Sequence, residues 1–181
     1  KDLEDVKKVL FTGTPCQIAG IKAYLGIDYD NLYCQDLICH GVPSAKVWKN
    51  YKKQISNGKT LSKVSFRNKS SSWKGYSVEY AFTDGSRILQ PASIDPYMRA
   101  FLLGVSVRPS CYNCSFRMLH RKSDITLADF WGVENVCPEI DDDKGTSLVI
   151  IHSLKGKELF SEISNNLTLR EVDVLPAVKS N

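Results

Sequence analysis

Short apolar runs and helical periodicity take turns along the N-terminal part of the chain. Val9–Phe11 form an apolar run that predicts a buried strand, which ends at a turn at Gly13. Thr14 and Gln17 then have the spacing of a capping box, and apolar residues at helical spacing follow as far as Gly26. The next expected elements are a strand over 32–38 and a helix over 45–56. This order predicts an α/β layer whose sheet contains parallel strands.

The middle of the chain changes to alternation of apolar and polar residues. The segments that alternate are 61–67, 76–82 and 87–90, and Asp84-Gly85 is a hairpin turn. The remaining expected elements are a helix over 95–103, a strand over 124–130, an acidic loop over 136–145, a strand over 147–152, a helix over 155–164 and a strand over 167–172. The pattern predicts a mixed α/β fold, in which a parallel-containing sheet with helices carries an antiparallel strand insertion.

Length and composition are those of an ordinary globular protein. The chain has 181 residues, of which 43% are hydrophobic and 24% charged, so we expect a single domain over 1–181. The net charge of +4 is dispersed, which argues against nucleic-acid binding. We see neither an apolar window long enough to span a membrane nor a signal peptide, and we therefore expect a cytoplasmic protein. Because the chain begins without Met, we interpret it as a fragment of a longer protein.

Four of the six cysteines stand where metal ligands are commonly found. Cys111 and Cys114 have the C-x-x-C spacing, which lets two thiolates from one loop bind a single metal or cluster. Cys16 lies in the first turn of an expected helix, where free N–H groups favour a thiolate. Cys39 follows an expected strand, and ligands bind at such strand ends in α/β sheets. We therefore take these four cysteines as the candidate metal ligands.

The other two cysteines fit other roles. Cys34 lies inside a strand and is interpreted as a core residue, and Cys137, in a loop, is interpreted as a spare thiol.

Four thiolates suit either zinc or an iron–sulfur cluster. A cluster is favoured slightly, because zinc ribbons usually pair two C-x-x-C knuckles and this chain has one. The zinc alternative would be a colourless structural or partner-binding module. A third alternative, a glycan-related transferase that uses Asp124 and Asp129, is disfavoured because residues five apart on a strand face opposite sides.

Five short motifs in this chain resemble those of one family, in the same order, between about Val9 and Gly156. The family is the coenzyme F420 hydrogenase/dehydrogenase beta subunit, and the resemblance is to its C-terminal domain. The motifs are FxGTPCQ at Phe11–Gln17, D-x-x-CHG-x-P-S at Asp36–Ser44, R-x-x-C-x-x-C-x-F at Arg108–Phe116, D-I-T-x-G-D-F-W-G at Asp124–Gly132 and G-x-S-L-V at Gly145–Val149. The chain departs from the pattern at Ala128, where the family usually has glycine.

The resemblance implies an oxidoreductase that carries FAD and a [4Fe–4S] cluster. Electrons would pass between the cluster, the flavin and a deazaflavin, coenzyme F420, or another small-molecule acceptor, and the partners would be other redox subunits or domains. Carried over by position, the cluster ligands are Cys16, Cys39, Cys111 and Cys114. The positions that would line the flavin pocket are Thr12, Gly13, Thr14, Arg121, Lys122 and Asp124. No side chain is expected to act as a general base, so no catalytic residue is assigned.

Overall fold

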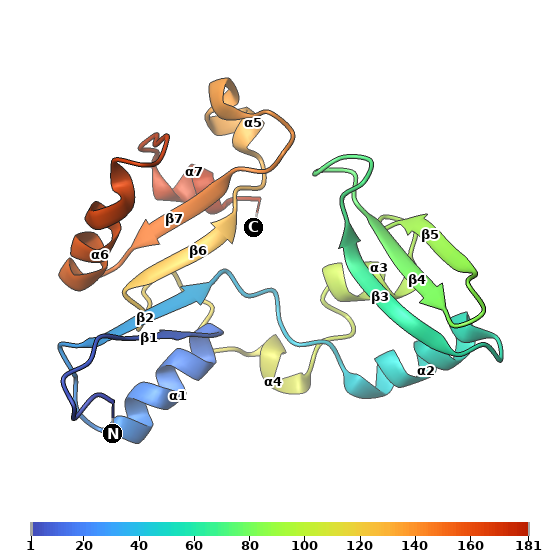
Figure 1. The fold of residues 1–181 in the computed structure, drawn as a ribbon, viewed down its shortest axis with the longest axis horizontal. Coiled ribbons are helices and arrows are strands. Elements are labelled where there is room, and N and C mark those ends of the chain that lie inside the picture. Colours follow the sequence, from blue (N-terminus) through green and yellow to red (C-terminus); the bar gives the residue numbers. More distant parts are fainter. Residues whose placement is uncertain (1, 181) are drawn as a thin grey trace. The chain divides into compact units, whose positions relative to one another are not determined.

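A computed structural model describes residues 2–180, and Figure 1 shows its helices and strands. In chain order they are β1 (Val9–Thr12), α1 (Pro15–Leu25), β2 (Leu32–Leu37), α2 (Ala45–Ser56), β3 (Leu61–Asn68), β4 (Ser77–Phe82), β5 (Arg87–Pro91), α3 (Pro96–Leu102), α4 (Pro109–Tyr112), β6 (Ile125–Asp129), α5 (Val133–Val136), the 3₁₀ turn η1 (Pro138–Ile140), β7 (Ser147–Ile151), α6 (Leu154–Ser164) and α7 (Val174–Val178). The mixed α/β class expected from the sequence is confirmed, with parallel strands in one sheet and an antiparallel sheet formed by the chain between β2 and β6.

The chain packs as two compact units. Unit 1 consists of the described residues up to Cys39 together with those from Ser115 onward, and unit 2 is His40–Cys114. Unit 2 is therefore inserted between β2 and β6 of unit 1. The single domain expected over 1–181 stays a prediction, and unfolding experiments on the separate units can test it.

Unit 1 is built on a sheet with the strand order β1-β2-β6-β7 (Figure 1). β1 pairs with β2 in parallel and β2 with β6 in parallel, whereas β7 runs antiparallel to β6. Consequently the carboxyl ends of β1 and β2 lie at the same edge of the sheet. This is the edge at which α/β proteins usually bind ligands.

The helix α1 begins and ends where local sequence signals predict. Gln17 Oε1 accepts a hydrogen bond from the Thr14 N–H at 2.8 Å, and Pro15 occupies the first helical position, where a missing N–H costs nothing. Gly26 ends the helix with a φ of 71°, a left-handed conformation that favours glycine. Ile18 of α1 packs on Leu32 and Cys34 of β2, and this contact fixes the helix against the sheet.

Unit 2 is an antiparallel sheet, β3-β4-β5, covered by helices. Val78, Tyr80 and Phe82 alternate along β4 and are all buried, so one face of the sheet forms the core. The helix α2 contributes Trp48, Tyr51 and Ile55 to that core, and α3 contributes Met98. The sequence predicts the bounds of α2 correctly, but Val47, which we expected on its apolar face, is 37% exposed.

At the C-terminal end of the chain one expected strand is wrong and one helix was not expected. Residues 167–172 form no strand, and a short helix, α7, follows at Val174–Val178. Leu167 and Leu169 are about half exposed, and Val172 is the residue of this segment that packs against the core cluster around Phe130. The helix α7 contains Pro176, which disfavours a helix in a sequence pattern. No helix in residues 2–180 is long and apolar enough to cross a membrane.

Candidate functional site

The turn from β1 into α1 carries four of the predicted site residues. The Gly13 N–H donates to the Gln35 carbonyl at 3.1 Å, which holds the turn against β2. Thr12 is exposed at the end of β1, and Thr14 is the N-cap of α1. The Thr14 hydroxyl lies 3.1 Å from Cys16 Sγ, and Cys16 is exposed in the first turn of α1. The Cys16 sulfur therefore lies beside the Thr14 hydroxyl at the start of α1.

Cys39 lies two residues beyond the end of β2 and is half-buried. Because β1 and β2 are parallel, Cys16 and Cys39 both follow carboxyl ends of neighbouring strands in unit 1. The sequence argument that these two thiols belong to one edge of the sheet therefore agrees with the topology.

The C-x-x-C pair belongs to unit 2. Cys111 lies in the short helix α4 and Cys114 follows it, and both are half-buried. The Val42 N–H donates to Cys111 Sγ at 3.5 Å. Gly41 has a φ of 131°, and a Cβ there would lie 2.9 Å from Val107 Cγ1 and 3.5 Å from the Cys111 Cβ. The positive φ and the close approach to Val107 therefore both require glycine at position 41, two residues after Cys39.

The chemistry of this donor set fits an iron–sulfur cluster. Thiolates are its usual ligands, and backbone N–H groups aimed at sulfur, as at Cys111, are among the means by which proteins tune a cluster. Within residues 2–180, however, no group of three or more Cys, His, Asp or Glu side chains lies close enough to hold one metal ion. Cys16 and Cys39 lie in one unit and Cys111 and Cys114 in the other.

The remaining thiols have environments that disfavour metal binding. Cys34 is 1% exposed, and burial raises the pKa of its thiol. Cys137 donates to Glu139 Oε1 at 3.1 Å, and this hydrogen bond raises the pKa of the Cys137 thiol. Both side chains are therefore protonated thiols at neutral pH. Cys34 is a core residue as expected, and Cys137, which we expected to be spare in a loop, packs in the core cluster around Phe130.

The second group of predicted site residues consists of Arg121, Lys122 and Asp124, of which the two cations are at least partly exposed and the anion is buried. Lys122 is exposed and Arg121 is half-buried, with its guanidinium donating to the Phe116 carbonyl at 2.6 Å. Asp124 is 3% exposed and accepts from the Cys34 N–H at 2.8 Å and from the Ser153 hydroxyl at 2.5 Å. Both carboxylate oxygens of Asp124 thus join parts of unit 1, and its assignment to the flavin pocket stays a prediction.

A buried polar network in unit 1 was missed by the sequence analysis. Thr126 of β6 donates to Asp36 of β2, and its hydroxyl lies 2.8 Å from His152 Nε2. Both Asp36 and Thr126 are 1% exposed. The signal in the sequence was an Asp at a position where the alternation of Leu32 and Cys34 requires a buried side chain.

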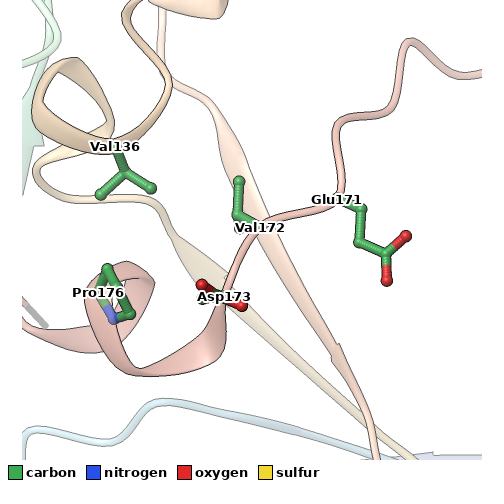
Figure 2. A pocket seen from close by; sticks show the side chains of 5 residues that line it. All are labelled: Val136, Glu171, Val172, Asp173 and Pro176. Carbon is green, nitrogen blue, oxygen red and sulfur yellow. The ribbon is translucent and has the colours of Figure 1, made fainter.

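Two hollows in unit 1 contain none of the predicted site residues. One, of about 460 Å³, is lined by Val136, Glu171, Val172, Asp173 and Pro176. Figure 2 shows Val136 and Pro176 on one side of it and Glu171 on the other. Two carboxylates would repel the phosphates of a flavin nucleotide. The second hollow has a volume of about 620 Å³, lies between β7 and residues 168–177, and has a largely apolar lining.

The fold defines a class of protein, a mixed α/β protein in which four cysteines lie exposed or half-buried at or just beyond the ends of helices and strands. Residues 6–174 match the family described as the C terminus of the coenzyme F420 hydrogenase/dehydrogenase beta subunit. The match covers nearly the whole chain, and the chain belongs to this family. It is accordingly part of an oxidoreductase family, and the description as a beta subunit implies other subunits of the same complex. A comparison with curated proteins finds no match.

Proposed function

We propose that this chain is an iron–sulfur flavoprotein domain that passes electrons between a [4Fe–4S] cluster, FAD and an acceptor. The observation that carries the proposal is the family match over residues 6–174. The acceptor would be a deazaflavin such as coenzyme F420 or another small molecule. The coarser statement, that the family is one of redox proteins, follows from its description.

The cluster would be held by Cys16, Cys39, Cys111 and Cys114. In support, Cys16 lies in the first turn of α1 and Cys111 accepts a backbone hydrogen bond at its sulfur. The two cysteines left out of this set, Cys34 and Cys137, are buried, and their thiols have raised pKa values. When bound, the cluster would supply single-electron steps to a flavin that exchanges electrons in pairs.

The flavin would be bound by Thr12, Gly13, Thr14, Arg121, Lys122 and Asp124. The N–H groups at the start of an eleven-residue helix, α1, attract phosphate, and exposed cations such as Lys122 add to that attraction. Asp124 would act indirectly, by holding β2 and Ser153 in place through its two occupied oxygens.

The chain would work in the cytoplasm with other redox subunits or domains of the same system. The direct test uses the full-length protein, purified without oxygen, and measures its flavin content and its reduction of a deazaflavin. The double substitution of Arg121→Ala and Lys122→Ala should weaken FAD binding by about thirtyfold, because two cations near a phosphate contribute about 1 kcal/mol each. Flavin content that is zero in the wild-type protein would contradict the proposal.

A zinc-stabilised binding module is the alternative, and the C-x-x-C pair with a backbone N–H on Cys111 favours it equally. The two functions differ in metal content and colour. A colourless, oxygen-free preparation that contains stoichiometric zinc would support the zinc-stabilised module and contradict the iron–sulfur domain.

A further inference from the structure

The Asp36–Thr126–His152 network joins three strands of unit 1 through one hydroxyl group. Asp36 and Thr126 face each other in the register of β2 and β6, and His152 follows β7. The Thr126 hydroxyl donates to Asp36 Oδ1, and His152 Nε2 lies 2.8 Å from the same hydroxyl. Asp36 Oδ2 is buried and has no hydrogen-bond partner within the described residues. A buried carboxyl oxygen without a partner is unusual in a folded protein.

The protons of this network can be placed in two arrangements. The hydroxyl has one proton, so when Thr126 donates to Asp36, the His152 Nε2–H must donate to the Thr126 oxygen. In the other arrangement Asp36 carries the proton, Asp36 donates to Thr126, and Thr126 donates to Nε2. A concerted shift from the first to the second moves one proton from His152 to Asp36, and no electron moves.

The exposed fraction of the side chains falls along the network from His152 to Asp36. His152 is half-buried, whereas Thr126 and Asp36 are each 1% exposed. The charged groups that act on His152 are Asp36 from β2, Asp124 next to β6, and His120 and Arg121 from the segment before β6. Burial is the main cause that lowers the pKa of His152, so the imidazole is neutral at pH 7. It can therefore take a proton from water as it gives one to Thr126.

The inner end of the network lies beside the β1–α1 turn. Asp36 follows Gln35, which pairs with Thr12 and accepts the Gly13 N–H at 3.1 Å. Alternation along β2 puts Asp36 on the same face as Cys34, which packs on Ile18 of α1. The Asp36 carboxyl thus lies on the α1 side of the sheet, at the level at which α1 begins.

We propose that His152, Thr126 and Asp36 form a proton relay that supplies a proton for the two-electron reduction of the acceptor. The inference rests on the proposed function, because the acceptor must be one that takes up protons with its electrons. Two electrons from the donor side and two protons from water reduce a deazaflavin, and the relay carries one of those protons. Asp36 receives that proton at Oδ1 and, as a neutral acid, gives the same proton to the acceptor, while His152 takes a replacement from water at Nδ1 and leaves hydroxide in the solvent.

The first test is independent of cofactors and follows the His152 ring by NMR across pH. Thr126→Val and Asp36→Asn should each move its titration midpoint, and Thr126→Ser, which keeps the hydroxyl, should restore the wild-type midpoint. A midpoint that is the same in all four proteins would overturn the relay.

The second test uses the full-length protein with its cofactors and compares two acceptors. A deazaflavin takes up protons on reduction, and a viologen takes an electron alone. The ratio of the deazaflavin rate to the viologen rate should fall about tenfold or more in Thr126→Val and recover in Thr126→Ser. If Thr126→Val does not fold, His152→Gln at the half-buried end takes its place.

The outcomes separate the two proposals. An unchanged rate ratio in the variants, with an active wild-type protein, would overturn the relay and leave the proposed function intact. A wild-type protein with cofactors bound that reduces neither acceptor would overturn both.

Discussion

At the scale of single residues, the cysteines of this chain fall into two groups by environment. Cys34 and Cys137 are buried among apolar side chains and have raised pKa values. Cys16, Cys39, Cys111 and Cys114 lie at or just beyond the ends of helices and strands and are exposed or half-buried. The sequence predicted the burial of Cys34 from its place inside a strand, whereas the burial of Cys137, expected as a spare thiol in a loop, was not predicted.

Asp95 is the polar centre of unit 2, and we predict that its charge stabilises the fold. It is 0% exposed and accepts hydrogen bonds from the Tyr51 and Tyr80 hydroxyls, the Gln90 side chain and the Met98 N–H. Asp95→Asn should lower the free energy of unfolding by about 3 kcal/mol, measured by urea denaturation, since it weakens several charge-assisted bonds. The control is Asp28→Asn, because Asp28 is 90% exposed and its loss should change stability by less than about 0.5 kcal/mol. Equal effects of the two substitutions would contradict this account of Asp95.

Tyr51 gives a prediction about alkaline pH. Burial, with the hydrogen bond to Asp95, raises the pKa of Tyr51 to about 12. The unfolded chain then loses the phenol proton near its ordinary pKa of 10.0, while the folded protein keeps it. Stability should therefore be complete below the ordinary pKa and decline as the pH rises from there to about 12. Tyr51→Phe should make the decline shallower in denaturation curves over that range, and an unchanged slope would show that Tyr51 does not titrate in this way.

At the scale of elements, local signals predicted most helices and strands of the fold. The amphipathic spacing of α2 and the capping residues of α1 lie within each element, so they can be read without knowledge of the rest. The strand expected over 167–172 does not form, because alternation of apolar and polar residues does not by itself provide a partner strand, and residues 167–171 are exposed. The Asp36–Thr126–His152 network was beyond prediction for a related reason, since it depends on the register of β2, β6 and β7.

Two glycines in helices of unit 1 should respond to alanine in opposite directions. A Cβ at Gly156 would collide with the backbone carbonyl of Asp124, so Gly156→Ala should cost about 2–3 kcal/mol in the free energy of unfolding. Gly20, in the middle of α1, has open space around its Cβ position, and Gly20→Ala should stabilise by about 0.5–1 kcal/mol. Both changes can be measured by thermal or urea unfolding. Stabilisation by Gly156→Ala would mean that α6 does not pack on β6 as described.

At the scale of the whole chain, unit 2 is an insertion with its own core. Val78, Tyr80, Phe82, Ala92 and Met98 are buried together within it, and Asp95 lies in the same unit. We predict that residues 40–114 alone unfold cooperatively on heating, because a core and a satisfied polar centre are both present. Asp95→Asn in this fragment should lower its melting temperature. A fragment without a cooperative transition would instead support the single domain expected from the sequence.

The central claim is that four particular thiols hold an iron–sulfur cluster, and metal analysis of matched cysteine variants tests it most directly. The full-length protein, purified without oxygen, should contain about four iron and four sulfide per chain. Cys16→Ser, Cys39→Ser, Cys111→Ser and Cys114→Ser should each lower that content sharply, whereas Cys137→Ser, the control at a thiol with a raised pKa, should retain it. Zinc without iron in the wild-type protein, or iron that none of the four substitutions reduces, would contradict the account.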